Sequence, residues 1–170
     1  MKGLQTVLFT GLLMPTMTAC SWFGGYLPIQ VTDDRPAGAK PAVVDVFAVP
    51  TALERERAAA TPVDEYFSTV GLPSRPQQVW RAALPASEDC LLLKGDPDYK
   101  LWRQGDIEVL TAVTPEPRRT VENGPETRRV FFSPRRADYP AGTRSLHLRL
   151  TAEGLQLEPS PRKLKRQPHP

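Results

Sequence analysis

The stretch 42–49, AVVDVFAV, decides the fold class of this chain. Val and Phe favour the pleated, half-buried surface of a strand, and Pro41 and Pro50 bound the stretch on either side. Asp45 is the one charged residue within it, and we expect its carboxylate at a solvent-facing or edge position. The stretch therefore predicts a β-strand, and its neighbours indicate what is built around it.

A short helix is predicted directly after this strand, at residues 51–60. Thr51 and Glu54 have the spacing of a capping box, and the Ala, Leu, Glu and Arg residues that follow are strong helix formers. A second helical turn is predicted to begin at the Thr-Pro pair 61–62. We expect Tyr66 and Phe67 on this turn to close one end of the hydrophobic core.

Further short strands are predicted along the rest of the chain, and each is bounded by turn residues. Their ranges are 26–31, 77–83, 89–93, 107–113, 128–133, 144–150 and 155–157, with a helical turn at 98–103 capped by Asp96. Strands do not alternate with helices, which indicates the absence of a parallel sheet. The pattern predicts a mainly β domain at residues 42–158, an antiparallel β-sandwich of about seven short strands with one or two short inserted helices.

The first 20 residues have the three parts of a bacterial export signal. Lys2 is followed by the apolar run 4–13, which is shorter than the roughly 20 residues that span a bilayer, and then by small residues. Residues 17–20, MTAC, resemble the lipobox of bacterial lipoproteins, in which a diacylglycerol is attached to the cysteine before cleavage; Met17 replaces the usual Leu or Val. This resemblance implies a signal peptide at 1–19 and lipidation of Cys20, the alternative being an ordinary secretory signal.

The predicted anchor also indicates where the protein resides. Two or three acyl chains on Cys20 bind membrane lipid stably, whereas one chain binds only marginally. Ser21 follows the cysteine, and the absence of an Asp there favours the outer membrane, with the protein facing the periplasm. The Gly- and Pro-rich stretch that follows predicts a flexible tether, so that residues 20–41 link the lipid to the sandwich.

Charge excludes a nucleic-acid partner. The chain has 22 basic and 19 acidic residues, but residues 20–160 hold 17 basic and 19 acidic residues, a net charge of −2. A slightly acidic body offers no surface that follows phosphates. Of the five remaining basic residues, Lys2 lies in the signal and four lie in the tail 159–170, which we expect to be disordered and solvated. The alternative is contact of the tail with an anionic partner such as lipid headgroups or peptidoglycan.

No enzymatic chemistry is predicted. His147 is the one histidine of the body, and a hydrolase needs a histidine oriented by an acid beside its nucleophile. Cys90 precedes three leucines, which predicts a buried small side chain, with an intermolecular disulfide as the alternative. Asp96 and Asp98 are explained by a helix start, and the remaining acids are too scattered for a metal site. No cofactor motif is present.

The order of elements resembles that of the TssJ-type outer-membrane lipoproteins of type VI secretion systems. It runs from lipobox and tether through the strand VVDVFAV and a helical insertion with Phe67 to strands at 107–113 and 144–157. The resemblance implies a transthyretin-like β-sandwich that docks a membrane-spanning envelope protein, such as an inner-membrane component of the apparatus, through a loop. The candidate loops are 114–126 and 134–142. The partner-binding residues are predicted in the first: Val121, Glu122, Asn123, Gly124, Pro125 and Glu126.

A second interpretation is an envelope lipoprotein that binds a glycan or another small ligand. Trp22, Trp80 and Trp102 would then stack on sugar rings. The directions of Trp80 and Trp102 discriminate between the two interpretations. Side chains that face the core favour docking, and neighbouring exposed rings favour ligand binding.

Overall fold

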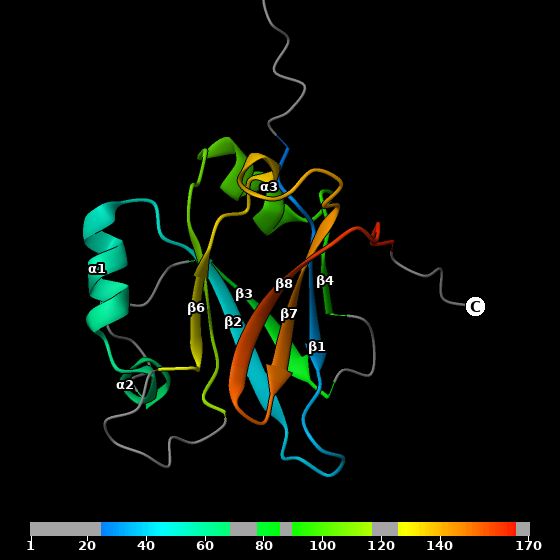
Figure 1. Ribbon diagram of the computed structural model, residues 1–170. Helices are drawn as coiled ribbons and strands as arrows, with labels where there is room; N and C mark the ends of the chain where they lie inside the picture. The colour runs from blue at the N-terminus through cyan, green and yellow to red at the C-terminus, as the bar shows by residue number, and fades with distance from the viewer. Residues whose placement is uncertain (1–24, 69–77, 86–89, 117–125, 166–170) are drawn as a thin grey trace, which may run out of the picture.

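The computed structural model describes residues 25–68, 78–85, 90–116 and 126–165. Its strands form two four-stranded sheets packed face to face (Figure 1). The first sheet has the order β4-β1-β7-β8, with β1 at Ile29–Asp33, β4 at Cys90–Leu92, β7 at Ser145–Thr151 and β8 at Gly154–Ser160. The second has the order β3-β2-β5-β6, with β2 at Ala42–Ala48, β3 at Val79–Leu84, β5 at Leu110–Val113 and β6 at Arg129–Phe132. The predicted β-sandwich is confirmed.

The position of β1 corrects two details of the prediction. β1 pairs with β7 in parallel, from Ile29 opposite Leu146 to Asp33 opposite Leu150, although the sequence indicated no parallel pairing. These strands are more than 100 residues apart in the chain, so the pair needs no crossover helix and leaves no strand-helix alternation in the sequence. The sandwich also begins before residue 42, because β1 lies inside the range 20–41 assigned to a tether.

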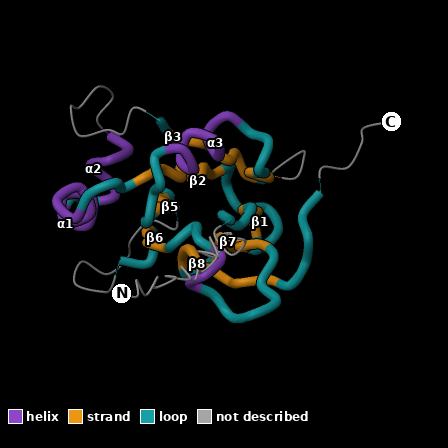
Figure 2. The backbone as a smooth tube through the Cα atoms, turned by 90° about the horizontal axis from the view of Figure 1, so that it is seen from above, coloured by secondary structure: helices purple, strands orange, loops and turns teal. Residues whose placement is uncertain are grey.

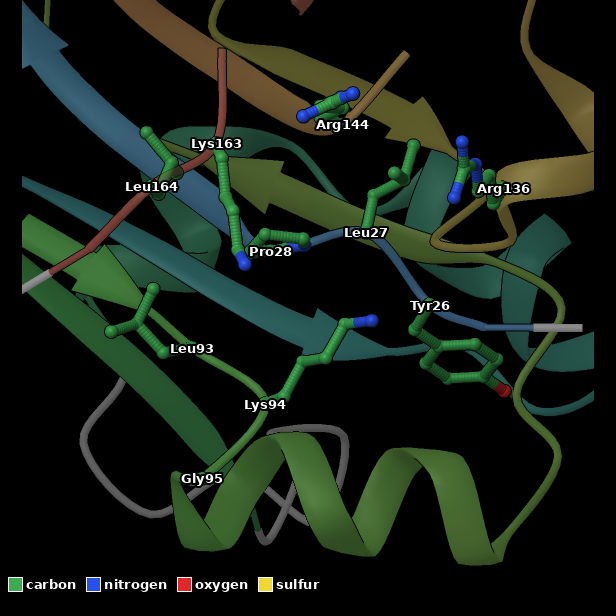
Figure 3. A pocket seen from close by; sticks show the side chains of 10 residues that line it. All are labelled: Tyr26, Leu27, Pro28, Leu93, Lys94, Gly95, Arg136, Arg144, Lys163 and Leu164. Atoms are coloured by element: carbon green, nitrogen blue, oxygen red, sulfur yellow. The ribbon is translucent and has the colours of Figure 1, made fainter. Parts of the chain in front are cut away.

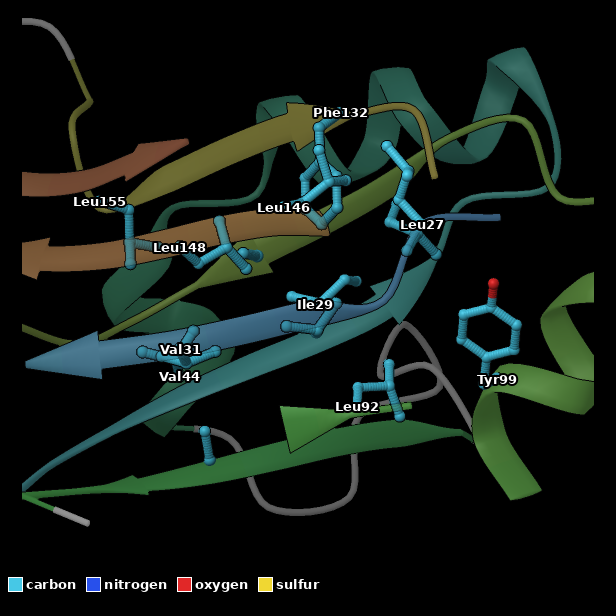
Figure 4. Close-up of a cluster of buried hydrophobic side chains, with 14 of the residues drawn as sticks. Leu27, Ile29, Val31, Val44, Leu92, Tyr99, Phe132, Leu146, Leu148 and Leu155 are labelled. Atoms are coloured by element: carbon cyan, nitrogen blue, oxygen red, sulfur yellow. The ribbon is translucent and has the colours of Figure 1, made fainter. Parts of the chain in front are cut away.

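The main core lies between the sheets and follows the alternation of the strands. Val44 and Val46 of β2 and the three leucines of β7 are completely buried. Figure 4 shows Val44, Leu146 and Leu148 within this cluster. Burying a Leu or Val side chain contributes about 1.5–3 kcal/mol. The leucines of β7 confirm the predicted period of two, because the side chains between them are partly exposed at His147 and Arg149.

The helix α3, Pro97–Gln104, closes one end of this core with Tyr99 and Trp102, which are 3% and 2% exposed. Tyr26 packs against Tyr99 and donates its hydroxyl to the carbonyl of Ile107 at 2.6 Å. Asp96 stands at the predicted cap position, but its carboxylate accepts the N–H of Leu93 instead of a helix N–H.

The outer face of the second sheet is covered by α1, Ala52–Ala60, and α2, Val63–Ser68 (Figure 2). Phe47 stacks on Tyr66 with ring centroids 5.5 Å apart, and Phe67 packs edge-on against Tyr66. Tyr66 and Phe67 therefore cover the sheet and do not close the end of the core as predicted. Their partners are Phe47, Val49 and Val113, which form a separate cluster from the main core. The predicted cap of α1 is confirmed, since Thr51 accepts the N–H of Glu54 at 3.2 Å.

The sandwich also continues beyond its predicted limit at residue 158. β8 ends at Ser160, and the Ser145 hydroxyl donates to the carbonyl of Arg162 at 2.8 Å. The first part of the tail that was predicted to be disordered, residues 159–165, therefore belongs to the described structure, and Arg162 is hydrogen-bonded to the sandwich. A short 3₁₀ turn, Arg136–Asp138, precedes β7. Among the described helices, none combines the length and apolar character needed to cross a bilayer.

Candidate docking site at the base of the β5–β6 loop

Most of the predicted functional residues lie outside the described part of the chain. These are Cys20, with the whole range 1–24, and Val121, Glu122, Asn123, Gly124 and Pro125 of the predicted docking loop. Glu126 is described, and so are both roots of the loop. The N–H of Thr114 donates to the carbonyl of Arg128 at 3.0 Å, and both residues are buried. A backbone hydrogen bond between Thr114 and Arg128 therefore joins the two ends of the loop where they meet the sheet.

Arg128 joins the returning strand to the helical insertion. Its guanidinium donates to both oxygens of Asp64 on α2, at 2.7 and 3.1 Å, and to both oxygens of Glu126, at 3.0 Å. The Arg128 side chain is 3% exposed, whereas that of Asp64 is 73% exposed. These hydrogen bonds to Glu126 and Asp64 raise the pKa of Arg128 above its ordinary value. The base of the loop and the start of α2 are thus one charged unit.

Arg129, the next residue, contacts the other helix. Its guanidinium donates to the carbonyls of Ala59 and Thr61 at the end of α1, and burial lowers its pKa. The guanidinium of Arg55 on α1 lies 5.6 Å from the ring centroid of Phe131, a cation–π distance. α1 has no buried residue of its own, so these polar contacts hold it against β6.

The first sheet also contacts the returning end of the β5–β6 loop, at Thr127. The N–H of Leu155 donates to the carbonyl of Thr127 at 2.8 Å. Gly154 has φ +133°, and a Cβ at this position would lie 2.3 Å from the Thr127 carbonyl oxygen. Only glycine fits this turn without displacing the root, because both the backbone conformation and the space exclude a side chain.

Asp45 lies behind this base and is completely buried. Arg81 donates to both of its oxygens at 2.6 and 2.7 Å, which raises the pKa of Arg81, and the Tyr66 hydroxyl donates at 3.1 Å. The predicted solvent-facing or edge position of Asp45 is wrong, because β2 is a central strand and α2 covers this face. The signal that could have found the pair is the register, which sets Asp45 directly opposite Arg81.

The residues considered for catalysis do not meet. Cys90 pairs with Val31 on the core-facing side of β1, whereas His147 pairs with the neighbouring Gln30, so the two side chains lie on opposite faces of the sheet. Cys90 is half-buried, and its thiol donates to the carbonyl of Ala83 at 3.6 Å. In the described ranges, no group of three or more His, Cys, Asp or Glu side chains is placed to hold a metal ion.

The described tryptophans face the core. Trp102 is 2% exposed, and Trp80 is partly buried and packs against the same cluster. Trp22 lies outside the described residues. This is the arrangement that favours docking over stacking on sugar rings.

No protein-family model matches the chain. The search of curated proteins also gave no match. Solved structures similar to it include the C-terminal domain of the T6SS protein TssM from EAEC, with 14% identity and a TM-score of 0.49 over 78% of this chain and 98% of that one. Lip of Serratia marcescens, a membrane-bound component of the type VI secretion system, has 12% identity and a TM-score of 0.46 over 78% of this chain and 96% of that one. The T6SS lipoprotein TssJ1 of Pseudomonas aeruginosa has 15% identity and a TM-score of 0.43 over 81% of this chain and 99% of that one.

TssJ1 is a type VI secretion lipoprotein, of the family that the order of sequence elements resembles, and Lip is a membrane-bound component of the same kind of system. Because the identities are 12–15% and the TM-scores lie below 0.5, function is inferred below from the chain's own residues.

Proposed function

We propose that the protein is a lipid-anchored docking component of a bacterial envelope complex. In this proposal Cys20 carries the acyl chains, the body faces the periplasm from the outer membrane, and the β5–β6 loop contacts an envelope protein. The residues of the body act as a connector between lipid and partner and perform no chemistry.

The observation that supports this proposal most strongly is the polarity of the sandwich. The carbonyl of Gly25, where the described chain begins, accepts the N–H of Arg136, and Tyr26 forms a bridge with Arg135, just after β6. The docking loop instead re-enters at Arg128, just before β6. Seven residues of extended chain separate the two points, which is roughly 20 Å at about 3.3 Å per residue. A lipid at one end and a partner at the other can therefore be bound together.

The proposed partner is a membrane-spanning component of a type VI secretion apparatus. Support comes from the sequence resemblance and from the elements that carry it, since β2, the insertion α1–α2 and the β5–β6 loop follow in the same order. The loop roots are held by Arg128, Thr114 and Gly154, so the segment between them is presented from a fixed base.

The docking test exchanges residues 121–125 for a Gly-Ser segment of equal length. Glu126 stays, because its carboxylate binds Arg128 and the exchange would otherwise disturb the base. We expect this variant to lose capture of the inner-membrane component of the type VI secretion apparatus, with an unchanged thermal melt. The matched control replaces Ala37, Ala39 and Lys40 of the exposed β1–β2 loop by Ser and should retain capture. Retained capture in the 121–125 variant would reject this loop.

The anchoring test is mass spectrometry of the membrane fraction. We expect a mature N-terminus at Cys20 carrying acyl chains. The Cys20→Ala variant should lose both the acyl mass and cleavage at this position. A parent protein cleaved elsewhere, or a variant processed like the parent, would contradict the proposed anchor.

A further inference from the structure

A cavity of about 550 Å³ opens at the end of the sandwich where the described chain begins (Figure 3). Its lining includes Tyr26, Leu27 and Pro28, which precede β1. Ten residues line it, of which four are basic and none is acidic. The basic residues are Lys94, Arg136, Arg144 and Lys163. We name this cavity, with its four basic side chains, the basic pocket.

The four basic residues come from separate parts of the chain. Lys94 follows β4, Arg136 begins the 3₁₀ turn, Arg144 precedes β7, and Lys163 follows β8. In Figure 3, Lys163 and Lys94 extend toward each other from two different segments, and Arg144 and Arg136 lie on two further segments beside Leu27. A run of lysines on one solvated face would not converge in this way. The fold itself concentrates the positive charge here.

The basic pocket has no counterion among the described residues. By contrast, five arginines outside the basic pocket form ion pairs with acids among the described residues, namely Arg35, Arg81, Arg128, Arg135 and Arg149. Within the same described ranges, none of the four basic residues of the pocket forms an ion pair or a side-chain hydrogen bond. Converging cations without acids bind an anion from outside the chain most favourably.

The pocket lies close to the predicted anchor along the chain. Tyr26 is six residues from Cys20, which limits their separation to about 20 Å in a fully extended chain. Leu27, Pro28 and Leu164 add an apolar border to the basic lining. A charged centre with an apolar border matches a phosphate headgroup joined to its glycerol and acyl chains, whereas free phosphate has no apolar part.

We propose that the basic pocket binds the phosphate headgroup of an anionic phospholipid in the membrane that holds the anchor. The claim that this side of the protein faces the membrane rests on the proposed acylation of Cys20. The affinity of the pocket for the headgroup does not depend on that acylation. Lipid binding here would orient the body on the membrane and direct the β5–β6 loop away from it.

The test uses a chain of residues 20–170 with Cys20→Ser, so that no acyl chain contributes to binding. The described fold begins at Gly25, and every described strand and helix is retained. Flotation is measured with vesicles of phosphatidylcholine alone and with vesicles that also contain phosphatidylglycerol. The pocket variant is Lys94→Gln with Arg144→Gln. The matched control is Lys40→Gln with Arg57→Gln, which removes the same charges from exposed sites outside the pocket.

We expect binding to the anionic vesicles only, reduced about thirtyfold in the pocket variant, because each basic residue near an anionic surface contributes about fivefold. The control should bind within about threefold of the parent, since a distant charge contributes little beyond a Debye length. Equal losses in both variants would show a general charge effect and overturn the proposal. Binding of inorganic phosphate without vesicle binding would overturn the lipid assignment.

This outcome is separable from that of the proposed function. Failure of flotation leaves the acyl mass at Cys20 and the capture of the envelope partner as they are. Loss of the acyl mass in the anchoring test leaves the vesicle measurement unchanged, since the tested chain carries no lipid.

Discussion

The two ends of the sandwich differ in whether their basic side chains are paired with acids. At the loop end two arginines with buried side chains are paired with acids: Arg128 binds Asp64 and Glu126, and Arg35 binds Asp33 at 2.7 Å. At the other end, the four basic residues of the pocket converge without a counterion among the described residues. The same residue types therefore stabilise the fold at one end and remain available to a ligand at the other.

The difference teaches that net charge alone is a poor guide to partners. The chain carries a formal charge of +3, and its predicted body is slightly acidic. Neither number distinguishes an arginine bound to Asp64 from one that lines an open cavity. What decides is whether the fold supplies an acid within reach, and this depends on the elements that meet at each end.

The largest expected effect compares two glycines at the two ends. Gly154→Ala should lower the free energy of unfolding by about 4 kcal/mol, because its Cβ would lie 2.3 Å from the Thr127 carbonyl oxygen and its φ is +133°. Gly142→Ala should cost only about 1 kcal/mol, because its φ is +94° but no atom lies within 4 Å of the added Cβ. Urea denaturation of both variants measures the difference. Equal losses would mean that the backbone at Thr127 moves to accommodate the added Cβ, which would contradict the proposal that the loop has a fixed base.

The next effect compares a paired arginine with an unpaired one. Arg128→Gln should lower the free energy of unfolding by about 2 kcal/mol, since it leaves two acids without their buried partner, although Asp64 is 73% exposed and regains water. Arg144→Gln should stay within about 0.5 kcal/mol of the parent, as for most surface changes. Denaturant midpoints of the two variants provide the measurement. A comparable loss in Arg144→Gln would show that the pocket arginine also stabilises the fold.

Most strands could be predicted because each has one buried face and therefore a regular pattern. Leu146, Leu148 and Leu150 are a clear case, and Thr51 marked the start of α1 equally well. A strand was also expected at 26–31, overlapping β1, but the Gly and Pro residues around it placed it in the tether, and its central position depends on β7, far along the chain. The burial of Asp45 could not be read locally, because the side chains that cover and bind it come from α2 and β3.

The strands that flank the 114–126 loop could be predicted, but the construction of the loop's base could not. The loop 114–126 was chosen by its turn residues, whereas its base depends on Arg128 meeting Asp64, which is 64 residues earlier. No local pattern links two such residues. The basic pocket was further from prediction, because its four side chains come from four segments, of which the sequence drew attention only to the tail that holds Lys163.

The smallest expected effect separates two acid-dependent losses of stability. Burial, followed by the charge of Arg162, lowers the pKa of His147 below 6.5, and the charge of Arg149 acts in the same direction while that of Glu158 opposes it. The unfolded chain then takes up this proton before the folded one, so stability should fall as the pH drops through 6.5. Asp33, whose pKa Arg35 lowers below 3.8 by hydrogen bonding, should add its loss only as the pH drops through 3.8. Thermal melts of His147→Gln should lack the first loss and keep the second; an unchanged first loss would assign it to another group.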